Sequence, residues 1–236
     1  MTEYDVVIVG GGVAGLSAGI FTARAGLETL IVDQGRSILA RNALLENYPG
    51  FPIGINPRRF LDMVEAQARH AGCTFDWAGV SDLSVTGAGF EVHMGARSVA
   101  TRYVVAASWG DTGYLSGLDI GVDEGFIESG ATGRTSLDGL YAAGRLAAQY
   151  HQAIIAAGHG AQVALTLLRD DDPDFYNDWT TPEGYFTNRG YKVPAGCEEI
   201  DDAERRRREE RALETLREHV ERDYSEGPDS HPENES

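Results

Sequence analysis

Lysine, cysteine and long apolar runs are scarce in this sequence of 236 residues. Lys192 is the only lysine, and 37 acidic residues against 20 Lys and Arg give a formal net charge of −17. A phosphate backbone or an anionic membrane would repel such a chain, so we expect no nucleic-acid and no membrane partner. An acidic surface almost free of lysine is also typical of a halophilic protein, because salt screens the repulsion between carboxylates.

The two cysteines, Cys73 and Cys197, are too few for a disulfide framework and form no C-x-x-C pair. Cys73 opens a predicted core strand just after a predicted helix, which indicates an inert buried thiol. Cys197 lies in a Pro- and Gly-containing loop, and it is a candidate redox residue or an ordinary loop thiol. No pattern of metal ligands stands out.

The longest nearly apolar stretch, residues 153–168, is interrupted by His159 and Gln162 and by two glycines. It therefore falls short of the ~18 uninterrupted apolar residues that a membrane span needs. The chain opens on a strand-like run with no basic leader before it, from which we expect a cytoplasmic protein.

The first chemical signal is a strand–turn–helix–strand unit. Tyr4–Val9 is β-branched and almost continuously apolar, as in a strand buried in a parallel sheet. It runs into Gly10–Gly15, the predicted helix Leu16–Ala25, the strand Thr29–Val32 and then Asp33. These parts, in this order, predict a dinucleotide-binding fold.

Each glycine of the turn has a mechanical reason. Gly10 permits the tight turn, Gly12 lets the backbone approach a pyrophosphate, and Gly15 lets the helix pack closely on the sheet. The N–H groups at the helix N-terminus favour phosphate. Asp33 is placed to accept hydrogen bonds from an adenosine ribose.

The remaining pattern predicts an α/β, Rossmann-like domain whose parallel sheet carries an inserted antiparallel β-meander. Asn56 and Pro57 predict the start of a helix that continues to Ala71. Glycine-bearing turns then separate short β segments, and a buried strand and a buried helix close the domain. These later elements are a strand at 73–77, the meander at 80–85, 89–94 and 98–107, a strand at 139–144 and a helix at 152–168.

Four ordered motifs carry a family resemblance. They are Gly10–Gly15 with Asp33; Glu46-Asn47-Tyr48-Pro49-Gly50; Val104-Val105-Ala106-Ala107-Ser108; and Thr135-Ser136-Leu137-Asp138-Gly139-Leu140-Tyr141-Ala142-Ala143-Gly144, with His151-Gln152-Ala153 shortly after. The sequence thereby resembles the FAD-binding domain of the thioredoxin reductase-like flavoproteins. The resemblance implies FAD as cofactor and a homodimer, and it covers residues 3 to about 168.

The resemblance also implies the residues that contact the cofactor. They are Gly10, Gly12, Val13, Ala14, Gly15, Asp33, Gln34, Asn47, Val80, Ala107, Trp109, Gly144, Arg145, His151, Gln152 and Ala153. No catalytic residue is assigned, but His151 and Cys197 are candidates.

Three positions depart from the family pattern or leave two interpretations open. Arg145 stands where relatives have an aspartate; it cannot accept a hydrogen bond from FAD but could donate to the pyrophosphate. Trp109 replaces a glycine, and its indole either stacks on the cofactor or fills surface exposed by a missing domain. His151 either donates to the flavin edge or caps the following helix.

The largest departure is one of length. Relatives insert an NADPH-binding domain of roughly 100 residues or more, with their C-x-x-C pair, between the third and fourth motifs. Here only residues 109–131 lie between, without a second G-x-G-x-x-G and without cysteine. The sequence therefore predicts neither a nicotinamide site nor a dithiol.

Four regions follow from this pattern: an FAD-binding domain at 1–168, an aromatic-rich packing segment at 169–200, a charged helix at 201–224 and a disordered tail at 225–236. We expect the aromatic segment to pack over the flavin opening or a second subunit. The charged helix carries a narrow apolar stripe and indicates a solvated or dimer-docking element.

Two functions remain open. The first is an FAD-dependent oxidoreductase, not a thioredoxin reductase, that takes electrons from a small-molecule substrate or a protein donor. The second is a degenerate flavin- or adenine-nucleotide-binding module that senses or assembles without turnover, with Arg145 marking a relaxed cofactor site. A plain NAD-binding protein is a weaker third option, because it gives the second and fourth motifs no role.

Overall fold

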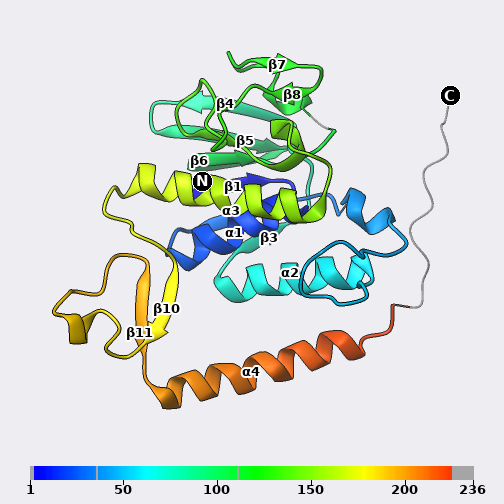
Figure 1. The fold of residues 1–236 in the computed structure, drawn as a ribbon. Helices are drawn as coiled ribbons and strands as arrows, with labels where there is room; N and C mark the ends of the chain where they lie inside the picture. The colour runs from blue at the N-terminus through cyan, green and yellow to red at the C-terminus, as the bar shows by residue number, and fades with distance from the viewer. Residues whose placement is uncertain (1–2, 36, 111, 225–236) are drawn as a thin grey trace.

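The structure is a computed structural model that describes residues 3–35, 37–110 and 112–224. A parallel sheet forms its centre, with β1 (Glu3–Val9) between β2 (Thr29–Val32) and β6 (Arg97–Ala106) and with β3 (Thr74–Asp76) beside β2. In Figure 1 these strands follow one another from β6 through β1 to β3, which is the lowest of the three in the view. The predicted succession of strand, glycine turn, helix and second strand is confirmed.

Strand β6 pairs with two partners along one edge. Its first half is antiparallel to β5 (Gly89–Met94), which continues to β4 (Asp82–Thr86), and this is the predicted meander. Its last residues, Val104–Ala106, pair in parallel with β9 (Leu140–Ala142). The chain between β6 and β9 forms η2 (Gly113–Leu115) and the small hairpin of β7 (Val122–Asp123) and β8 (Phe126–Ile127).

The central strands bury both faces, as their continuous hydrophobicity predicts. Val6, Ile8 and Val105 face the helices α1 (Val13–Arg24) and α3 (Ala153–Asp171). The alternate residues of these strands point to the opposite face, where they pack against the meander and against residues within the segment 114–127. The site built at the ends of these strands therefore rests on a fully packed core.

Helix α2 (Pro57–Ala71) begins as the sequence predicts. The Asn56 side chain accepts a hydrogen bond from the Arg58 N–H, and Pro57 takes the first helical position. Gly72 ends the helix in a left-handed conformation at φ 115°. Between β2 and α2 the described residues include the short helix η1 (Ile38–Arg41).

The tail packs on the far end of α1, not on the glycine turn. Its strands β10 (Trp179–Pro182) and β11 (Cys197–Ile200) pair in parallel, and η4 (Thr187–Arg189) lies between them. Arg24, the last residue of α1, forms a bidentate ion pair with Asp178 at 2.7 Å. The aromatic segment was expected over the flavin opening or a second subunit; here it covers the C-terminal end of α1.

Helix α4 (Asp202–Glu221) follows the tail and ends three residues short of the predicted 224. Asp201 caps it, because its side chain accepts from the Glu204 N–H at 2.7 Å. The predicted disordered tail, 225–236, lies outside the described residues. Among those described, no helix is long and apolar enough to cross a bilayer.

Helices α1 and α3 cross at close range because glycine and alanine line their contact. A Cβ placed on Gly160 would lie 2.1 Å from the Ala14 carbonyl oxygen, whereas one on Gly158 of the same helix would meet nothing within 4 Å. Backbone therefore meets backbone at Gly160. This contact holds α3 against the first turn of α1.

We predict that Gly160→Ala destabilises the fold by at least about 2 kcal/mol, since the new methyl overlaps backbone that has no room to move. Gly158→Ala is the matched control and is expected to stabilise by up to about 1 kcal/mol through helix propensity. Urea unfolding of both variants measures the difference. Equal stabilities would contradict the close contact.

Candidate functional site

The glycine turn between β1 and α1 lies at the carboxyl end of the sheet. The Gly10 N–H donates to the Val32 carbonyl at 2.8 Å, and a Cβ on Gly10 would lie 2.7 Å from the Ala107 carbonyl oxygen. A Cβ on Gly15 would lie 1.9 Å from the Gly10 carbonyl oxygen. Gly10 and Gly15 thus serve the tight turn and the close helix packing that the motif predicts.

Gly12 differs from both, because its side-chain direction is open. A Cβ there would have Ser37 Oγ at 4.0 Å as its nearest neighbour. Gly12 caps α1 with φ −74°, a conformation open to any residue. The turn therefore presents a bare backbone surface beside the first-turn N–H groups of Val13, Ala14 and Gly15, which suits an anion.

Asp33 at the end of β2 lies against the same turn. Its carboxylate accepts a hydrogen bond from the Gly35 N–H at 2.9 Å, and a Cβ on Gly11 would lie 2.8 Å from its Cγ. The motif gives Gly11 no role of its own. Because Gly11 has no side chain, the Asp33 carboxylate can lie against the turn. Gln34 continues beside Gly79, where a Cβ would lie 3.0 Å from Gln34 Nε2.

The second part of the site joins a loop to the start of α3. Asn47 Nδ2 donates to Gln152 Oε1 at 2.8 Å, across 105 positions of sequence. Gln152 caps α3, and Ala153 is its first residue. Two sequence motifs that were read separately therefore meet at one helix N-terminus.

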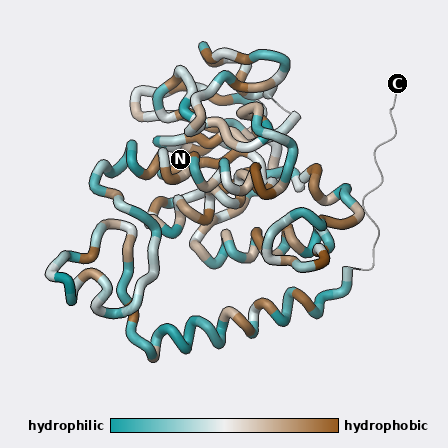
Figure 2. The backbone as a smooth tube through the Cα atoms, in the orientation of Figure 1, coloured by the Kyte–Doolittle hydropathy of each residue, from teal (hydrophilic) through white to brown (hydrophobic). Residues whose placement is uncertain are grey.

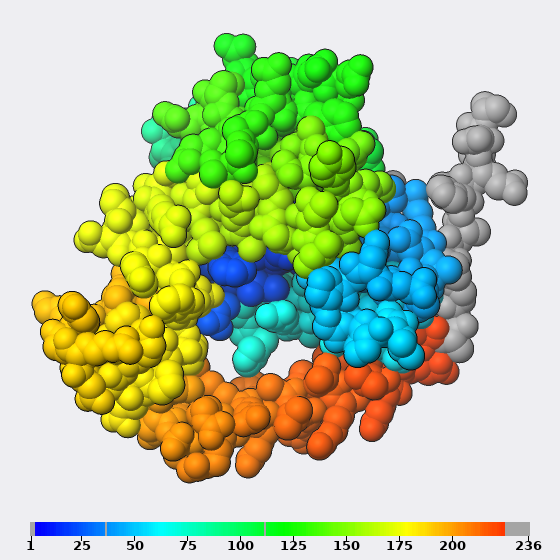
Figure 3. Space-filling model, in the orientation of Figure 1, coloured from blue at the N-terminus to red at the C-terminus, as the bar shows by residue number. Residues whose placement is uncertain are grey.

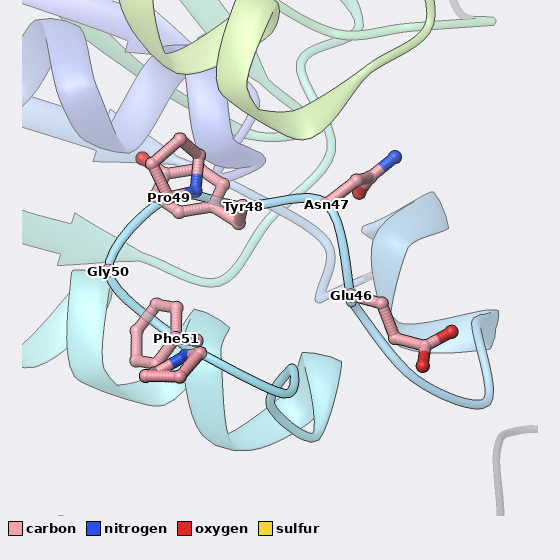
Figure 4. Close-up of a pocket in the computed structure, with 7 residues that line it drawn as sticks. Glu46, Asn47, Tyr48, Pro49, Gly50 and Phe51 are labelled. Carbon is pink, nitrogen blue, oxygen red and sulfur yellow. The ribbon is translucent and has the colours of Figure 1, made fainter.

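The loop that carries Asn47 wraps an open hollow of about 460 Å³ lined by residues 46–52. Figure 4 shows Asn47 pointing out of this loop, with Pro49 and Phe51 on either side of Gly50. Tyr48 packs on Phe60 of α2 with 4.6 Å between the ring centroids, and burial raises the pKa of its phenol. This packing fixes the loop against α2.

The third part of the site follows β9, where a glycine turn leads into η3 (Gly144–Ala147). A Cβ on Gly144 would lie 2.6 Å from Ala14 Cβ, so this turn also abuts α1. The Gly144 N–H donates to His159 Nδ1 at 3.0 Å. His159 is 5% exposed, which confirms the sequence interpretation of a packed histidine.

The Arg145 side chain is held by residues 109, 126 and 149 and not by the glycine turn. Its guanidinium lies 5.0 Å from the Trp109 ring centroid and 4.8 Å from that of Phe126, and it donates to the Gln149 carbonyl at 3.1 Å. Trp109 stacks on Phe126 at 5.5 Å and approaches the exposed His151 at 6.3 Å. We call Trp109, Phe126, Arg145 and His151 the aromatic–cation cluster.

Sequence reasoning missed Phe126, because nothing in its neighbourhood marks a contact with residues 17 and 19 positions away. Val80 also differs in character from the other predicted site residues, since its side chain is 8% exposed and belongs to the core under the meander.

The structure does not bring Cys197 to this site. Cys197 lies in a hollow with Ala23 and Arg24, at the far end of α1, and α1 spans 12 residues or about 18 Å. Burial also raises the pKa of its thiol, which disfavours the thiolate. Cys73 is buried and its pKa is raised to about 12, as expected of an inert thiol.

Comparison with known proteins agrees with this geometry. A family model described as an FAD binding domain matches residues 5–41. Thioredoxin reductase of Treponema pallidum is 32% identical over 111 residues, 45% of this chain and 36% of that protein. Thioredoxin reductase of Rickettsia felis is 29% identical over 182 residues, 70% of this chain and 56% of that protein.

Solved structures show the same fold. A thioredoxin reductase from Gloeobacter violaceus superimposes with a TM-score of 0.68 at 18% identity, over 73% of this chain and 97% of that one. The thioredoxin reductase of T. acidophilum gives 0.67 at 18% identity, over 72% and 99%. The chain is related to the thioredoxin reductase-like FAD-binding proteins.

FAD is thus the cofactor indicated for this fold, and the residues present suit it. The bare surface at Gly12, the free N–H groups of the first turn of α1 and the carboxylate of Asp33 form a cradle that a Cβ at Gly12 would fill. No cluster of three or more His, Cys, Asp or Glu suited to a metal occurs among the residues described. The relatives share about a third to a half of their length with this chain.

We predict a pH effect from His159. Burial lowers its pKa below the 6.5 of an exposed imidazole, while the Ala131 carbonyl partly opposes this shift. Below about pH 6.5 the unfolded chain therefore binds more protons than the folded one. The stability that neutral His159 contributes is present above that pH and is lost as pH falls.

His159→Asn keeps an acceptor near the Gly144 N–H without titrating, so its unfolding free energy should fall less between pH 6.5 and pH 5 than that of the wild type. His159→Leu removes the acceptor and should lose about 1–3 kcal/mol at every pH. Urea unfolding across this range tests both. Parallel pH slopes for wild type and His159→Asn would refute the assignment.

Proposed function

We propose that this chain is an FAD-dependent oxidoreductase of the thioredoxin reductase type that works without an NADPH domain or dithiol of its own. Its electrons come from a small-molecule substrate or a partner protein. The proposed setting is a cytoplasm of high salt, because the chain carries a net charge of −17 and a single lysine. The same charge disfavours nucleic acid as a partner.

One observation carries this proposal. Strands β6 and β9 are neighbours in the sheet, and residues 107–139 are all that joins them. The resemblance places a second nucleotide-binding domain of roughly 100 residues at this junction in relatives. The connection here holds η2, the β7–β8 hairpin and the Trp109–Phe126 stack, and its sequence contains neither a second G-x-G-x-x-G nor a cysteine.

The thiols support the same conclusion. A dithiol needs two cysteines close together, and the chain has only Cys73 and Cys197. One is in the core and the other is in the tail. Reduction of thioredoxin through a C-x-x-C pair is therefore not proposed for this chain.

The proposed FAD site uses the three parts described above. The first turn of α1 would hold the pyrophosphate through its N–H groups and partial positive charge. Asp33 would accept hydrogen bonds from the adenosine ribose. Gln34 and the backbone of Val80 would border the adenine, while Ala107 and Gly144 would form the floor of the site.

The flavin end would lie at the start of α3. Asn47 and Gln152 already fix each other there, so the loop at 46–52 and the helix N-terminus form one rigid edge. His151 precedes the cap of α3, and the Ala153 N–H lies in its first turn. Bound FAD would accept a hydride or single electrons. The partial positive charge at the N-terminus of α3 would favour the anionic form of the reduced flavin.

A second candidate function, a module that binds flavin or an adenine nucleotide without turnover, draws on Arg145. In this structure Arg145 is held by Trp109, Phe126 and the Gln149 carbonyl. An arginine held in this way cannot accept a hydrogen bond from FAD, as the aspartate of the relatives does. It also gives the cofactor no direct phosphate contact. The module remains an alternative outcome of the reduction experiment below.

We predict that Gly12→Asp abolishes tight FAD binding while the protein stays folded. Aspartate is a favoured helix cap, and the backbone conformation at Gly12 accepts any residue. Its carboxylate, however, would stand where the pyrophosphate approaches. FAD affinity should fall at least about 100-fold, or about 2.7 kcal/mol.

Gly12→Asn is the matched control, because it has the same shape without the charge, and it should bind FAD more tightly than Gly12→Asp. Absorbance titration of deflavinated protein measures affinity, and circular dichroism confirms folding. Wild-type affinity in Gly12→Asp would show that the turn does not hold the pyrophosphate. A wild-type protein that takes up no FAD would overturn the proposed function itself.

We also predict that neither NADPH nor NADH reduces the bound flavin above the background rate, whereas dithionite reduces it completely. Stopped-flow absorbance, with a thioredoxin reductase as positive control, gives the comparison. Rapid reduction by NADPH would contradict the absence of a nicotinamide site. Reduction by dithionite but by no protein or small-molecule donor would favour the binding module over the enzyme.

A further inference from the structure

The half-buried guanidinium of Arg145 has no carboxylate partner in the part of the chain that the structure describes. Of its five N–H donors, one donates to the Gln149 carbonyl at 3.1 Å. Its Nε is covered by protein and meets no acceptor. In a chain with 37 acidic residues, this positive charge is thus held in place and left available to an anion from outside.

Aromatic rings hold this guanidinium without neutralising it. Arg145 lies over the rings of Trp109 and Phe126, at 5.0 and 4.8 Å from their centroids, and these two rings stack on each other at 5.5 Å. A cation–π contact fixes a cation but leaves its charge in place, whereas a carboxylate would cancel it. A side chain that only filled surface would need neither the charge nor the cost of the covered Nε donor. The contacts therefore favour a binding role for Arg145.

The aromatic–cation cluster adjoins the proposed FAD site. Three of its members, Trp109, Arg145 and His151, lie within two positions of residues assigned to that site, which are Ala107, Gly144 and Gln152. The strand end at 107 abuts the glycine turn, and the turn at 144 abuts the first turn of α1. A molecule bound at the cluster would therefore lie beside bound FAD.

The fourth member comes from the short connection between β6 and β9. Phe126 belongs to β8 of that connection. Figure 3 shows the connection, in green, in direct contact with the yellow-green residues of η3 and α3. Figure 2 shows it at the top of the view as a mixture of hydrophilic and hydrophobic positions. Where the resemblance places a second domain, this chain thus places a ring that seats a cation.

The exposed indole of Trp109 indicates what else the ligand carries. Trp109 is 40% exposed, and a planar apolar group packs well on such a ring. The guanidinium beside it matches the two oxygens of a carboxylate. The exposed ring of His151, 6.3 Å from the indole, offers a further N–H donor. These groups together suit a planar molecule that bears a carboxylate.

We propose that the aromatic–cation cluster is the substrate site of this protein and that it binds a planar organic carboxylate. Arg145 receives the carboxylate through its terminal Nη groups, and the planar part of the substrate packs on Trp109. This proposal rests on the proposed function, because bound FAD would exchange electrons with the substrate. The carboxylate contact itself depends on protein residues alone, so it is measurable with and without FAD.

The test follows the tryptophan indole N–H signals of the full chain by NMR, with benzoate as the probe and benzamide as its neutral counterpart. The chain has three tryptophans, and Trp109→Phe assigns the signal of interest. Trp77 and Trp179, which are 56% and 42% exposed outside the cluster, are internal controls.

Benzoate should shift the Trp109 signal to saturation and leave the other two unchanged. Its dissociation constant should be at least about tenfold lower than that of benzamide, because only benzoate carries a charge for Arg145. Equal affinities for the two probes, or equal shifts of all three signals, would overturn the proposal.

Variants of Arg145 test the source of this preference. Arg145→Gln removes the charge and should abolish the preference for benzoate, whereas Arg145→Lys keeps the charge and should retain part of it. Arg189→Gln is the matched control, because Arg189 also lies over an aromatic ring, that of Tyr185 at 4.4 Å, but in η4 of the tail. It should bind both probes like the wild type. A preference for benzoate that survives Arg145→Gln would refute the assignment.

FAD uptake, measured by absorbance before each titration, keeps the two proposals apart. A wild type that takes up FAD without preferring benzoate loses the substrate site and keeps the proposed function. A wild type that takes up no FAD overturns the proposed function. The benzoate titration of the flavin-free protein then confirms or overturns the carboxylate site by itself.

Discussion

Backbone-to-backbone contact around the first turn of α1 is the constraint on which the rest of this structure depends. Gly10 meets Ala107 at the end of β6, Gly15 meets the carbonyl of Gly10, and Gly160 meets the carbonyl of Ala14. Two elements distant in sequence, the end of β6 and α3, thus meet the turn with no side chain between them. The N–H groups of that turn are left facing outward because everything behind them is filled.

The same crowding explains why the site is rigid before any ligand is considered. Gly144 abuts Ala14 and is held from behind by His159, which is itself buried in α3. Asn47 and Gln152 connect the opposite rim to the start of that same helix. Helix α3 is therefore the common support for both halves of the site, and its Gly160 allows it to approach α1 closely.

Local patterns predict much of this arrangement. The glycine turn, the cap of α2 by Asn56, the three-stranded meander and the strand before Gly144 all depend on residues near one another in the chain. The contacts that sequence reasoning missed are long-range. Phe126 contacts Trp109 and Arg145 because β8 folds back beside η3. No periodicity in residues 107–139 predicts that contact. The tail was predicted to pack, but the pairing of Arg24 with Asp178 that joins it to α1 spans 154 positions of sequence.

The shared edge of β6 has a consequence for how such a fold changes its length. Residues 106 and 142 are paired in the sheet, so the connection between them begins and ends at neighbouring positions. The entropy of closing a loop grows only with the logarithm of its length, about 0.6 kcal/mol per doubling. By this entropic term alone, a junction of this kind tolerates gain or loss of a whole module at little cost to folding.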